Sequence, residues 1–290
     1  MLGIVLIDKP LGLTSHDVVA RLRRTFSTRR IGHAGTLDPL ATGLLVVAVG
    51  PATRFLQYLP LEPKVYEGTI RFGIETTTQD REGEVVAERP VPEDLEAQIE
   101  AFRPEFLGLI QQLPPLYSAV KKAGKPLYVY ARKGEAVERE PRTVHIAEAT
   151  ILAVRGHDVD VRIVCSGGTY MRTWAHDLGQ RLGCGAHLAA LRRTAVGKFS
   201  LDQAHELDAV GPEHFISLAE ALPPAPLVPL NATQVAAVRN GQSLGFHRAL
   251  DSSLCGLLDP SGVVIGMARL TGNVLQPECV IPVVDPSSTH

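Results

Sequence analysis

Six consecutive apolar residues at positions 44–49 (LLVVAV) limit the fold of this chain more than any other feature of its sequence. A short uninterrupted run of this kind is typical of a β-strand that is buried on both faces. The run follows directly on a polar, glycine-rich segment at positions 32–43 (GHAGTLDPLATG). Because rigid elements often present functional residues on adjoining loops, this segment is the first candidate for chemistry.

Strand and helix patterns both occur in the rest of the chain, which predicts an α+β fold. We expect further strands at 4–7, 64–73, 144–154 and 159–165. We expect helices at 92–102 and 170–182, and one that starts at Thr14 or Ser15 and buries Val18, Val19, Leu22 and Phe26.

A proline-rich stretch at 222–229 has the composition of a linker or domain seam. After it we expect a short helix at 233–240 and two strands, at 254–259 and 263–270, joined by a tight turn. Short strands over about 60 residues predict a small β-barrel. The length of 290 residues allows one large domain and one small one.

Composition excludes several classes of protein. With 45% hydrophobic residues the chain can bury a core, and no apolar stretch reaches the roughly 18 residues of a membrane helix, so we expect a soluble, cytoplasmic protein. The four cysteines are far apart and form no CxxC pair, which argues against a disulfide framework or a zinc site. Walker, GxGxxG, HExxH and GxSxG motifs are missing as well.

Charge is balanced overall, with 29 Lys and Arg against 31 Asp and Glu, but it is unevenly distributed. Residues 1–60 hold seven basic and three acidic residues, and residues 117–145 hold seven and three again. Residues 200–290 hold nine acidic residues and three arginines. Such segregation fits either a solvated mixed surface or basic segments that meet a polyanion.

Asp38, in the TLDPL part of the glycine-rich segment, has two interpretations. An aspartate before a proline is commonly a turn residue. It can instead act as a nucleophile or base if a guanidinium holds it ionised in a desolvated pocket, and Arg172 in GTYMRT is the candidate partner. Arg172 could equally be an exposed arginine in the first turn of a helix. Taken singly, His33, Tyr66 and Leu191 fit a loop histidine, a strand aromatic and a core residue.

Several segments together resemble the TruB family of tRNA pseudouridine synthases. GHAGTLDPLATGLL resembles the catalytic motif of that family, and IDKPLGLTSHDVV its N-terminal motif. KVYEG with TTTQDREG, PPLYSAVKKAGKPLYVYARKGE and CSGGTYMRTWAHDLGQRLGCGAHLAALRRTAVGKF resemble further family segments, in the expected order. The chain departs from the family at Ala34, where Thr is common, and at Gly167, where Lys is common; the second departure removes a positive charge near Arg172.

The resemblance implies a pseudouridine-synthase fold, with a central mixed, mainly antiparallel sheet flanked by helices and a small C-terminal PUA-like barrel. It implies that the chain isomerises uridine to pseudouridine in the tRNA T loop, at position 55, by base flipping and without a cofactor or metal. Asp38 would be the nucleophile, Arg172 its partner, and Tyr66 would lie against the uracil. The remaining implied substrate contacts are His33, Tyr170, Leu191, Lys9, Lys121, Lys122, Arg132, Arg142, Arg192 and Arg193.

The same resemblance suggests a division of the chain and a simple assembly. The catalytic domain would span residues 1–222, with an RNA-contacting insert at about 75–145, followed by the PUA-like domain at 223–285 and a tail at 286–290. We expect a monomer that acts on the tRNA T arm without a membrane or a protein partner. The alternative function is an RNA-binding or tRNA-folding protein that uses the same pocket without chemistry. The acidic C-terminal domain could bind RNA or simply support the catalytic domain.

Overall fold

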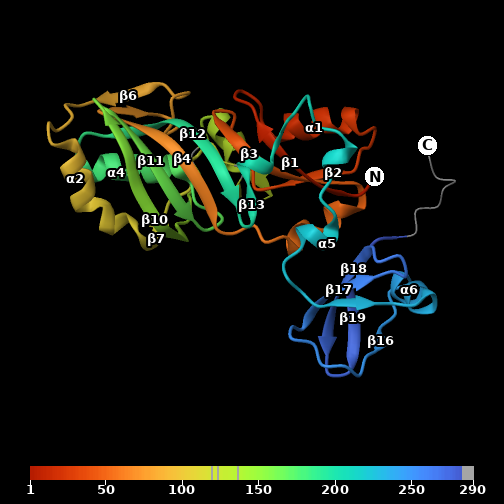
Figure 1. Cartoon of the computed structure of the whole chain (residues 1–290). Coiled ribbons are helices and arrows are strands. Elements are labelled where there is room, and N and C mark those ends of the chain that lie inside the picture. Colours follow the sequence, from red (N-terminus) through yellow and green to blue (C-terminus); the bar gives the residue numbers. More distant parts are fainter. Residues whose placement is uncertain (119, 123, 136, 283–290) are drawn as a thin grey trace.

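The computed structural model describes residues 1–118, 120–122, 124–135 and 137–282. Figure 1 shows a large unit built on one long sheet and a smaller C-terminal sheet, in blue, that lies beside the N-terminal half of the large unit. The expected tail at 286–290 lies outside the described residues. No helix in the described part is long and apolar enough to cross a membrane.

A mixed sheet forms the large unit. Two of its strand pairs, β1 with β14 and β12 with β3, are parallel, and its other pairs are antiparallel. In spatial order the strands are β14 (His205–Glu206), β1 (Gly3–Lys9), β3 (Ala41–Val49), β12 (Ala186–Val196), β4 (Lys64–Phe72), β11 (Asp158–Cys165), β10 (Arg142–Arg155) and β7 (Gly108–Gln112). Strand β2 (Ile31–Ala34) pairs with β3, and β13 (Phe199–Ser200) with β12. The predicted mainly antiparallel sheet is confirmed.

Strand β3 contains the apolar run, and all six of its residues from Leu44 to Val49 are fully buried, as predicted. It is enclosed because β1 pairs with one edge, while β2 and β12 share the other. The preceding glycine-rich segment is only partly a loop, since its first residues form β2 and its last ones begin β3. The loop that carries Asp38 is therefore held at both ends by sheet hydrogen bonds.

Strand β12 lies at the centre of the sheet and was not predicted. Its sequence contains Arg192 and Arg193 in succession, which breaks the apolar pattern on which strand prediction depends. Arg193 is nevertheless completely buried, whereas Arg192 remains partly exposed. Successive residues of a strand face opposite sides of the sheet, so the side chains of the two arginines lie in different environments.

Helices cover the sheet where the amphipathic patterns predict them. Helix α1 (Ser15–Thr25) is capped by Thr14 and buries Val18, Val19 and Leu22 against the sheet. Helix α4 (Met171–Leu182) packs Trp174 and Leu178 into the core and ends at Gly183, whose φ of 81° suits a left-handed cap. The shorter helices are η1 (Gly50–Tyr58), α2 (Leu95–Phe102), η2 (Arg103–Phe106), α3 (Leu127–Arg132), η3 (Leu201–Gln203), η4 (Pro212–His214) and α5 (Leu218–Ala221).

The expected insert at about 75–145 is less separate from the sheet than the sequence suggests. Strand β7 and the start of β10 fall within this span and belong to the central sheet. The span also carries two small hairpins away from that sheet, one formed by β5 (Ile74–Thr76) with β6 (Val85–Glu88) and one by β8 (Lys121–Lys122) with β9 (Lys125–Pro126).

The C-terminal part is a curled half-barrel sheet. Its strands follow the order β15 (Leu227–Pro229), β17 (Leu254–Leu258), β18 (Val264–Thr271), β19 (Val274–Val280) and β16 (Leu244–Gly245), and α6 (Ala232–Arg239) packs nearby. Met267 and Cys279 belong to the same apolar cluster as Ile4 and Phe55 of the large unit. Arg54 also donates to the carbonyl of Val280 at 3.0 Å. The two sheets therefore share part of a core.

Candidate active site

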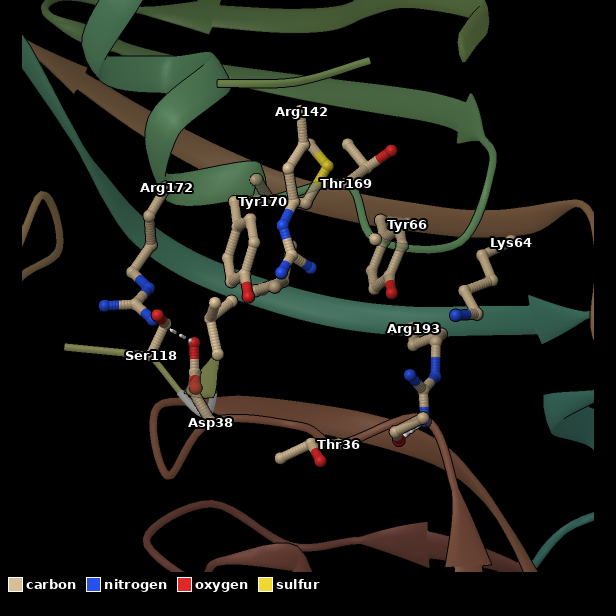
Figure 2. Close-up of a pocket in the computed structure, with 15 residues that line it drawn as sticks. Thr36, Asp38, Lys64, Tyr66, Ser118, Arg142, Thr169, Tyr170, Arg172 and Arg193 are labelled. Carbon is tan, nitrogen blue, oxygen red and sulfur yellow. Dashed lines mark hydrogen bonds and ion pairs between the residues drawn. The ribbon is translucent and has the colours of Figure 1, made fainter. Parts of the chain in front are cut away.

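Asp38 lies in the turn between β2 and β3 and faces a cavity of about 340 Å³. The carbonyl of Asp38 accepts a hydrogen bond from the amide of Ala41 at 3.0 Å, so the residue does take part in a turn. Its carboxylate, however, forms an ion pair with Arg172 at 2.9 Å between Oδ2 and Nη2. Figure 2 shows this pair at one side of the cavity. Both sequence interpretations of Asp38 thus apply, one to its backbone and one to its side chain.

Arg172 is held rigidly at the first turn of α4. Only 4% of the residue is exposed, so the alternative of a solvated first-turn arginine is wrong. Its guanidinium donates to the carbonyls of Tyr117 at 2.8 Å and Thr78 at 3.3 Å. It also lies 3.5 Å from the carboxylate of Asp80. These contacts fix the direction from which Arg172 meets Asp38.

Asp80 is a partner that the sequence analysis did not find. Its side chain is 5% exposed and accepts hydrogen bonds from the hydroxyl of Thr78 at 2.5 Å and the amide of Glu82 at 3.0 Å. Asp80 occurs in the TTTQDREG segment that resembles the family, where an aspartate among polar residues looks like an ordinary loop residue. Arg172 therefore bridges one buried and one accessible carboxylate.

The expectation of a desolvated nucleophile is not met in the free protein. The Asp38 side chain is 41% exposed, because it stands at the mouth of the cavity rather than at its floor. The deeply buried members of the network are Arg172 and Asp80, each about 5% exposed at the side chain. Exclusion of water from Asp38 would thus require a bound substrate.

The walls of the cavity combine charged and polar side chains with aromatic and aliphatic ones. Tyr66 from β4, Leu191 from β12, and Tyr170 and Met171 at the start of α4 line it. Burial raises the pKa of both Tyr66 and Tyr170, so the two phenols stay protonated at neutral pH. Apolar walls together with convergent polar groups are a usual feature of a small-ligand site.

A glutamine places the segment that leads into α4. Gln112 of β7 is 1% exposed, accepts a hydrogen bond from the amide of Tyr170 at 2.9 Å and donates to its carbonyl at 3.2 Å. Because Tyr170 lies just before the helix, this clamp positions both its own ring and Arg172. Nothing in the sequence pattern around Gln112 predicted this role.

His33 lies beside the cavity and not in its lining. It is part of β2, and its ring meets the ring of His16 edge-on, with centroids 5.6 Å apart. Burial lowers the pKa of His33, and the neighbouring His16 acts in the same direction, so the imidazole is neutral near pH 7. A neutral ring at this position can pack against a nucleotide that leaves its stack.

Two expected substrate contacts, Lys9 and Arg193, are buried instead. Both are 0% exposed. The ammonium of Lys9 donates to the carbonyls of Leu13 at 2.6 Å and Pro10 at 3.0 Å. Arg193 donates to the carbonyls of Leu44 at 2.8 Å and Gly35 at 2.9 Å, at the floor of the cavity. Each side chain thus uses two donors on backbone carbonyls, and the expected contact of either residue with the substrate stays a prediction.

The other basic residues differ in their availability. Arg142 is exposed and lines the cavity (Figure 2). Arg192 lines a second hollow on the other face of the sheet and pairs with Asp8 at 2.7 Å. Lys122 donates to the carbonyl of Glu138 at 2.7 Å. The side chains of Lys121 and Arg132 lie outside the described part of the structure.

Comparison with family models gives two matches that follow one another along the chain. The model for the TruB family pseudouridylate synthase N-terminal domain matches residues 23–171. The model for the tRNA pseudouridylate synthase B C-terminal domain matches residues 172–221.

Similar proteins extend over the whole chain. A protein of Thermobifida fusca named tRNA pseudouridine synthase B is 47% identical over 288 residues, which cover 96% of this chain and 98% of the relative. A Burkholderia mallei protein of the same name is 43% identical over 292 residues, covering 96% of each chain. Among solved structures, a chain from a crystal structure of a Cbf5-Nop10-Gar1 complex matches 97% of this chain and 85% of its own length, with a TM-score of 0.67 and 28% identity.

Proposed function

The chain belongs to the TruB family of pseudouridine synthases, isomerases that convert uridine to pseudouridine in tRNA, and we propose which of its residues perform that reaction and on which uridine. The proposed target is the T-loop uridine at position 55, and the proposed nucleophile is Asp38. The observation that carries this assignment is the ion pair of Asp38 with the buried Arg172 at a cavity that Tyr66 and Tyr170 also line.

The reaction exchanges one bond to the sugar for another. The bond between uracil N1 and ribose C1′ breaks, a bond between C5 and C1′ forms, C5 loses its proton and N1 gains one. Substrate and product are isomers, so electrons are neither supplied nor removed and the balance requires no cofactor. The site has to supply a carboxylate, a pocket that retains the detached uracil, and a route for the C5 proton.

The geometry supports these roles for residues of this chain. Asp38 reaches the cavity from its mouth, and attack on uracil C6, attack on C1′ and removal of a sugar proton all need a carboxylate at this position. Arg172 pairs with this carboxylate at 2.9 Å and fixes its orientation. We assign Tyr66 to the face of the uracil, with its phenol toward the C5 proton, and Tyr170 and Leu191 to the walls that hold the loose ring.

Access to the cavity requires that the target nucleotide leave the stack of the T loop. Flipping a nucleotide out of a stack costs a few kcal/mol, which contacts to the flipped state must offset. The neutral ring of His33, next to His16 at the edge of the site, is placed to pack against the displaced nucleotides. Once the base is inside, RNA would cover Asp38 and strengthen its attraction to Arg172 by excluding water.

We propose that the T arm is recognised through its shape and its phosphates, since A-form helices hide their base edges in a deep, narrow groove. Arg142 is the best placed of the expected phosphate contacts, because it is exposed and lines the cavity. Lys122 and Arg192 already have protein partners and would contribute less. Lys121 and Arg132 remain predictions from the sequence.

An RNA-binding protein without chemistry is the alternative. A carboxylate that is 41% exposed at the mouth of the cavity repels a polyanion, so a protein that only binds RNA gains nothing from Asp38. An enzyme needs the carboxylate and can offset that repulsion through the neighbouring guanidinium. The Asp38 and Arg172 pair therefore favours catalysis over binding alone.

Replacing Asp38 by Asn tests the assignment. We expect Asp38→Asn to bind a tRNA T-arm stem-loop within about tenfold of the unchanged protein, equivalent to about 1.4 kcal/mol, and to form no pseudouridine in carbodiimide mapping. Asp208→Asn is a matched control, because its side chain is 88% exposed and pairs with Arg21 in another part of the surface. Pseudouridine formation by Asp38→Asn at the unchanged rate would remove Asp38 from the mechanism.

We also propose the division of the chain into a catalytic domain at 1–222 and a PUA-like domain at 223–285. We further propose that the enzyme acts as a monomer without a protein partner. The apolar cluster shared by the two sheets supports a structural role for the C-terminal domain. Because tRNA is its substrate, we place the enzyme in the cytoplasm.

A further inference from the structure

We propose that Lys64 binds an RNA phosphate next to the target nucleotide, at the end of the cavity opposite Asp38. The inference rests on the proposed function, since it concerns the same cavity and the same RNA. In Figure 2, Asp38 and Arg172 lie on one side of Tyr66, and Lys64 lies on the other. Lys64 was not among the site residues predicted from the sequence.

Lys64 is a cation without a protein partner in the described part of the chain. It begins β4, is half-buried and lines the cavity, yet its ammonium forms no hydrogen bond or ion pair with the described residues. Burial lowers the pKa of Lys64, and the nearby guanidinium of Arg193 lowers it further, while the exposed Glu62 raises it. The protein thus holds the ammonium in a place where an added anion would stabilise its charged form.

Two glycines lie next to the ammonium of Lys64. A Cβ atom added to Gly35 would lie 3.6 Å from Nζ, and one added to Gly167 would lie 3.5 Å from it. Gly35 has a φ of 75°, so its turn favours glycine, but Gly167 has no such left-handed conformation. The carboxylate of Glu62 also lies here: its Oε1 accepts from the Gly167 amide at 2.9 Å and would stand 2.6 Å from that Cβ, so the ammonium and one exposed carboxylate share the space above Gly167.

The charges of the cavity are arranged to fit a nucleotide. At one end, the negative charge of Asp38 is paired with the positive charge of Arg172, so this end carries no surplus positive charge. Lys64 and the exposed Arg142 line the cavity, and neither has an acidic partner within 4.0 Å among the described residues. A nucleotide offers a neutral base and ribose together with one negative phosphate. With the ribose at Asp38, a neighbouring phosphate is the part of the RNA that can neutralise Lys64.

Lys64 also lies close to Gly167, the position where the family commonly has a lysine. The ammonium of Lys64 lies 3.5 Å from the point where the Cβ atom of a lysine at position 167 would stand. In this chain, Lys64 can therefore supply a positive charge near that position from the neighbouring strand.

A thermodynamic cycle between protein and RNA tests the contact. Two T-arm stem-loops would each carry one neutral methylphosphonate, at the phosphate 5′ or 3′ of the target uridine, and a third would be unmodified. All proteins would carry Asp38→Asn to prevent turnover. We expect the Lys64→Met protein to bind the unmodified RNA about tenfold more weakly than the protein that keeps Lys64. On one of the two modified RNAs, the two proteins should bind with equal affinity, because the phosphate charge that Lys64 contacts has been removed. The proposal is overturned if the loss caused by Lys64→Met is the same on all three RNAs.

Two further variants separate this contact from a general loss of charge or of structure. Lys198→Met removes the same charge at the seam between the two sheets, where Lys198 donates to the carbonyls of Glu220 and Leu222, and should leave affinity unchanged. Lys64→Arg keeps the charge and should restore at least part of the lost affinity. Because these measurements report binding alone, they stand or fall independently of whether Asp38 is the nucleophile.

Discussion

The buried hydroxyl of Ser15 binds both backbone groups of Leu37, the residue before Asp38. It accepts a hydrogen bond from the Leu37 amide at 2.9 Å and donates to the Leu37 carbonyl at 3.2 Å. On the other side of Asp38, the carbonyl of Pro39 accepts from the amide of Gly12 at 2.9 Å. The start of α1 and the loop before it thus hold the Asp38 turn from both sides.

We predict that Ser15→Ala slows isomerisation more than it destabilises the fold. It leaves two buried backbone groups without partners, a cost of about 1 to 3 kcal/mol in the free energy of unfolding. A displacement of the turn by about 1 Å can reduce kcat by about a hundredfold, while RNA affinity should be nearly unchanged. Single-turnover rates and urea denaturation measure the two effects.

Ser217→Ala provides the matched control for Ser15. Ser217 caps α5 by accepting from the amide of Glu220 at 3.2 Å, and its loss costs about 1 kcal/mol without touching the Asp38 turn. Its kcat should remain that of the unchanged enzyme. Equal losses of kcat in both variants would show that Ser15 acts only through overall stability.

A second prediction concerns the two carboxylates at Arg172. Arg172→Met should lower the free energy of unfolding by about 3 to 5 kcal/mol, because it leaves the buried Asp80 without its cation. In a protein that already carries Asp80→Asn, Arg172→Met should lower the free energy of unfolding distinctly less. Asp38→Asn alone should cost little stability, since that side chain is 41% exposed. Urea denaturation of the single and double variants completes the cycle, and equal costs of Arg172→Met in both backgrounds would contradict it.

A third prediction follows from the burial of Lys9, which lowers its pKa to about 8 from an ordinary value of 10.5. Between these two values the unfolded chain binds the proton and the folded protein does not. The contribution of Lys9 to the free energy of unfolding therefore rises with pH over this window, by up to about 1.4 kcal/mol per pH unit, and is at its lowest below pH 8.

Comparison with Lys9→Met isolates this titration from that of other groups. The difference in free energy of unfolding between the unchanged protein and the variant should grow in favour of the unchanged protein as the pH rises from 8 to 10. Denaturation curves at several pH values measure it. Parallel pH profiles for the two proteins would show that Lys9 keeps an ordinary pKa.

The fourth prediction concerns the dependence of tRNA binding on salt. Arg142→Ala should reduce the slope of log affinity against log salt concentration by about 0.7 to 0.9, the value for one lost phosphate contact. Lys122→Ala should change the slope less, because its ammonium is held by the carbonyl of Glu138. A larger effect of Lys122→Ala than of Arg142→Ala would reverse the proposed order of the two contacts.

Local sequence patterns were sufficient for much of the fold. The apolar run of β3, the amphipathic face of α1 and the hairpin of β17 and β18 were all predictable, because periodicity reports burial directly. Helix α2 begins at Leu95, three residues later than predicted from Pro92. Strand β12 was missed because a charged residue, Arg193, faces the interior, where arginine is rarely found.

The site was only partly predictable for a related reason. Asp38 and Arg172 were candidates from their residue types and received their roles from the family resemblance, since no local pattern shows that two residues so far apart in sequence form a pair. Asp80, Ser15, Gln112 and Lys64 depend on contacts across the fold, so polar residue types in loops and strands gave no signal. The burial of Lys9 and Arg193 was not foreseen: Lys9 donates to the Leu13 carbonyl before α1, and Arg193 donates to the Gly35 carbonyl in the loop that carries Asp38.

The apolar cluster that joins Met267 and Cys279 to Ile4 and Phe55 limits how such enzymes can be recombined. A chimaera with a C-terminal sheet from a homologue would bring together side chains that were selected in different parents, and mismatched volumes in a packed interior cost stability. A crossover in the proline-rich segment takes residues 50–59 and 264–281 from different parents, so the cluster members of one range would have to be changed to match the other.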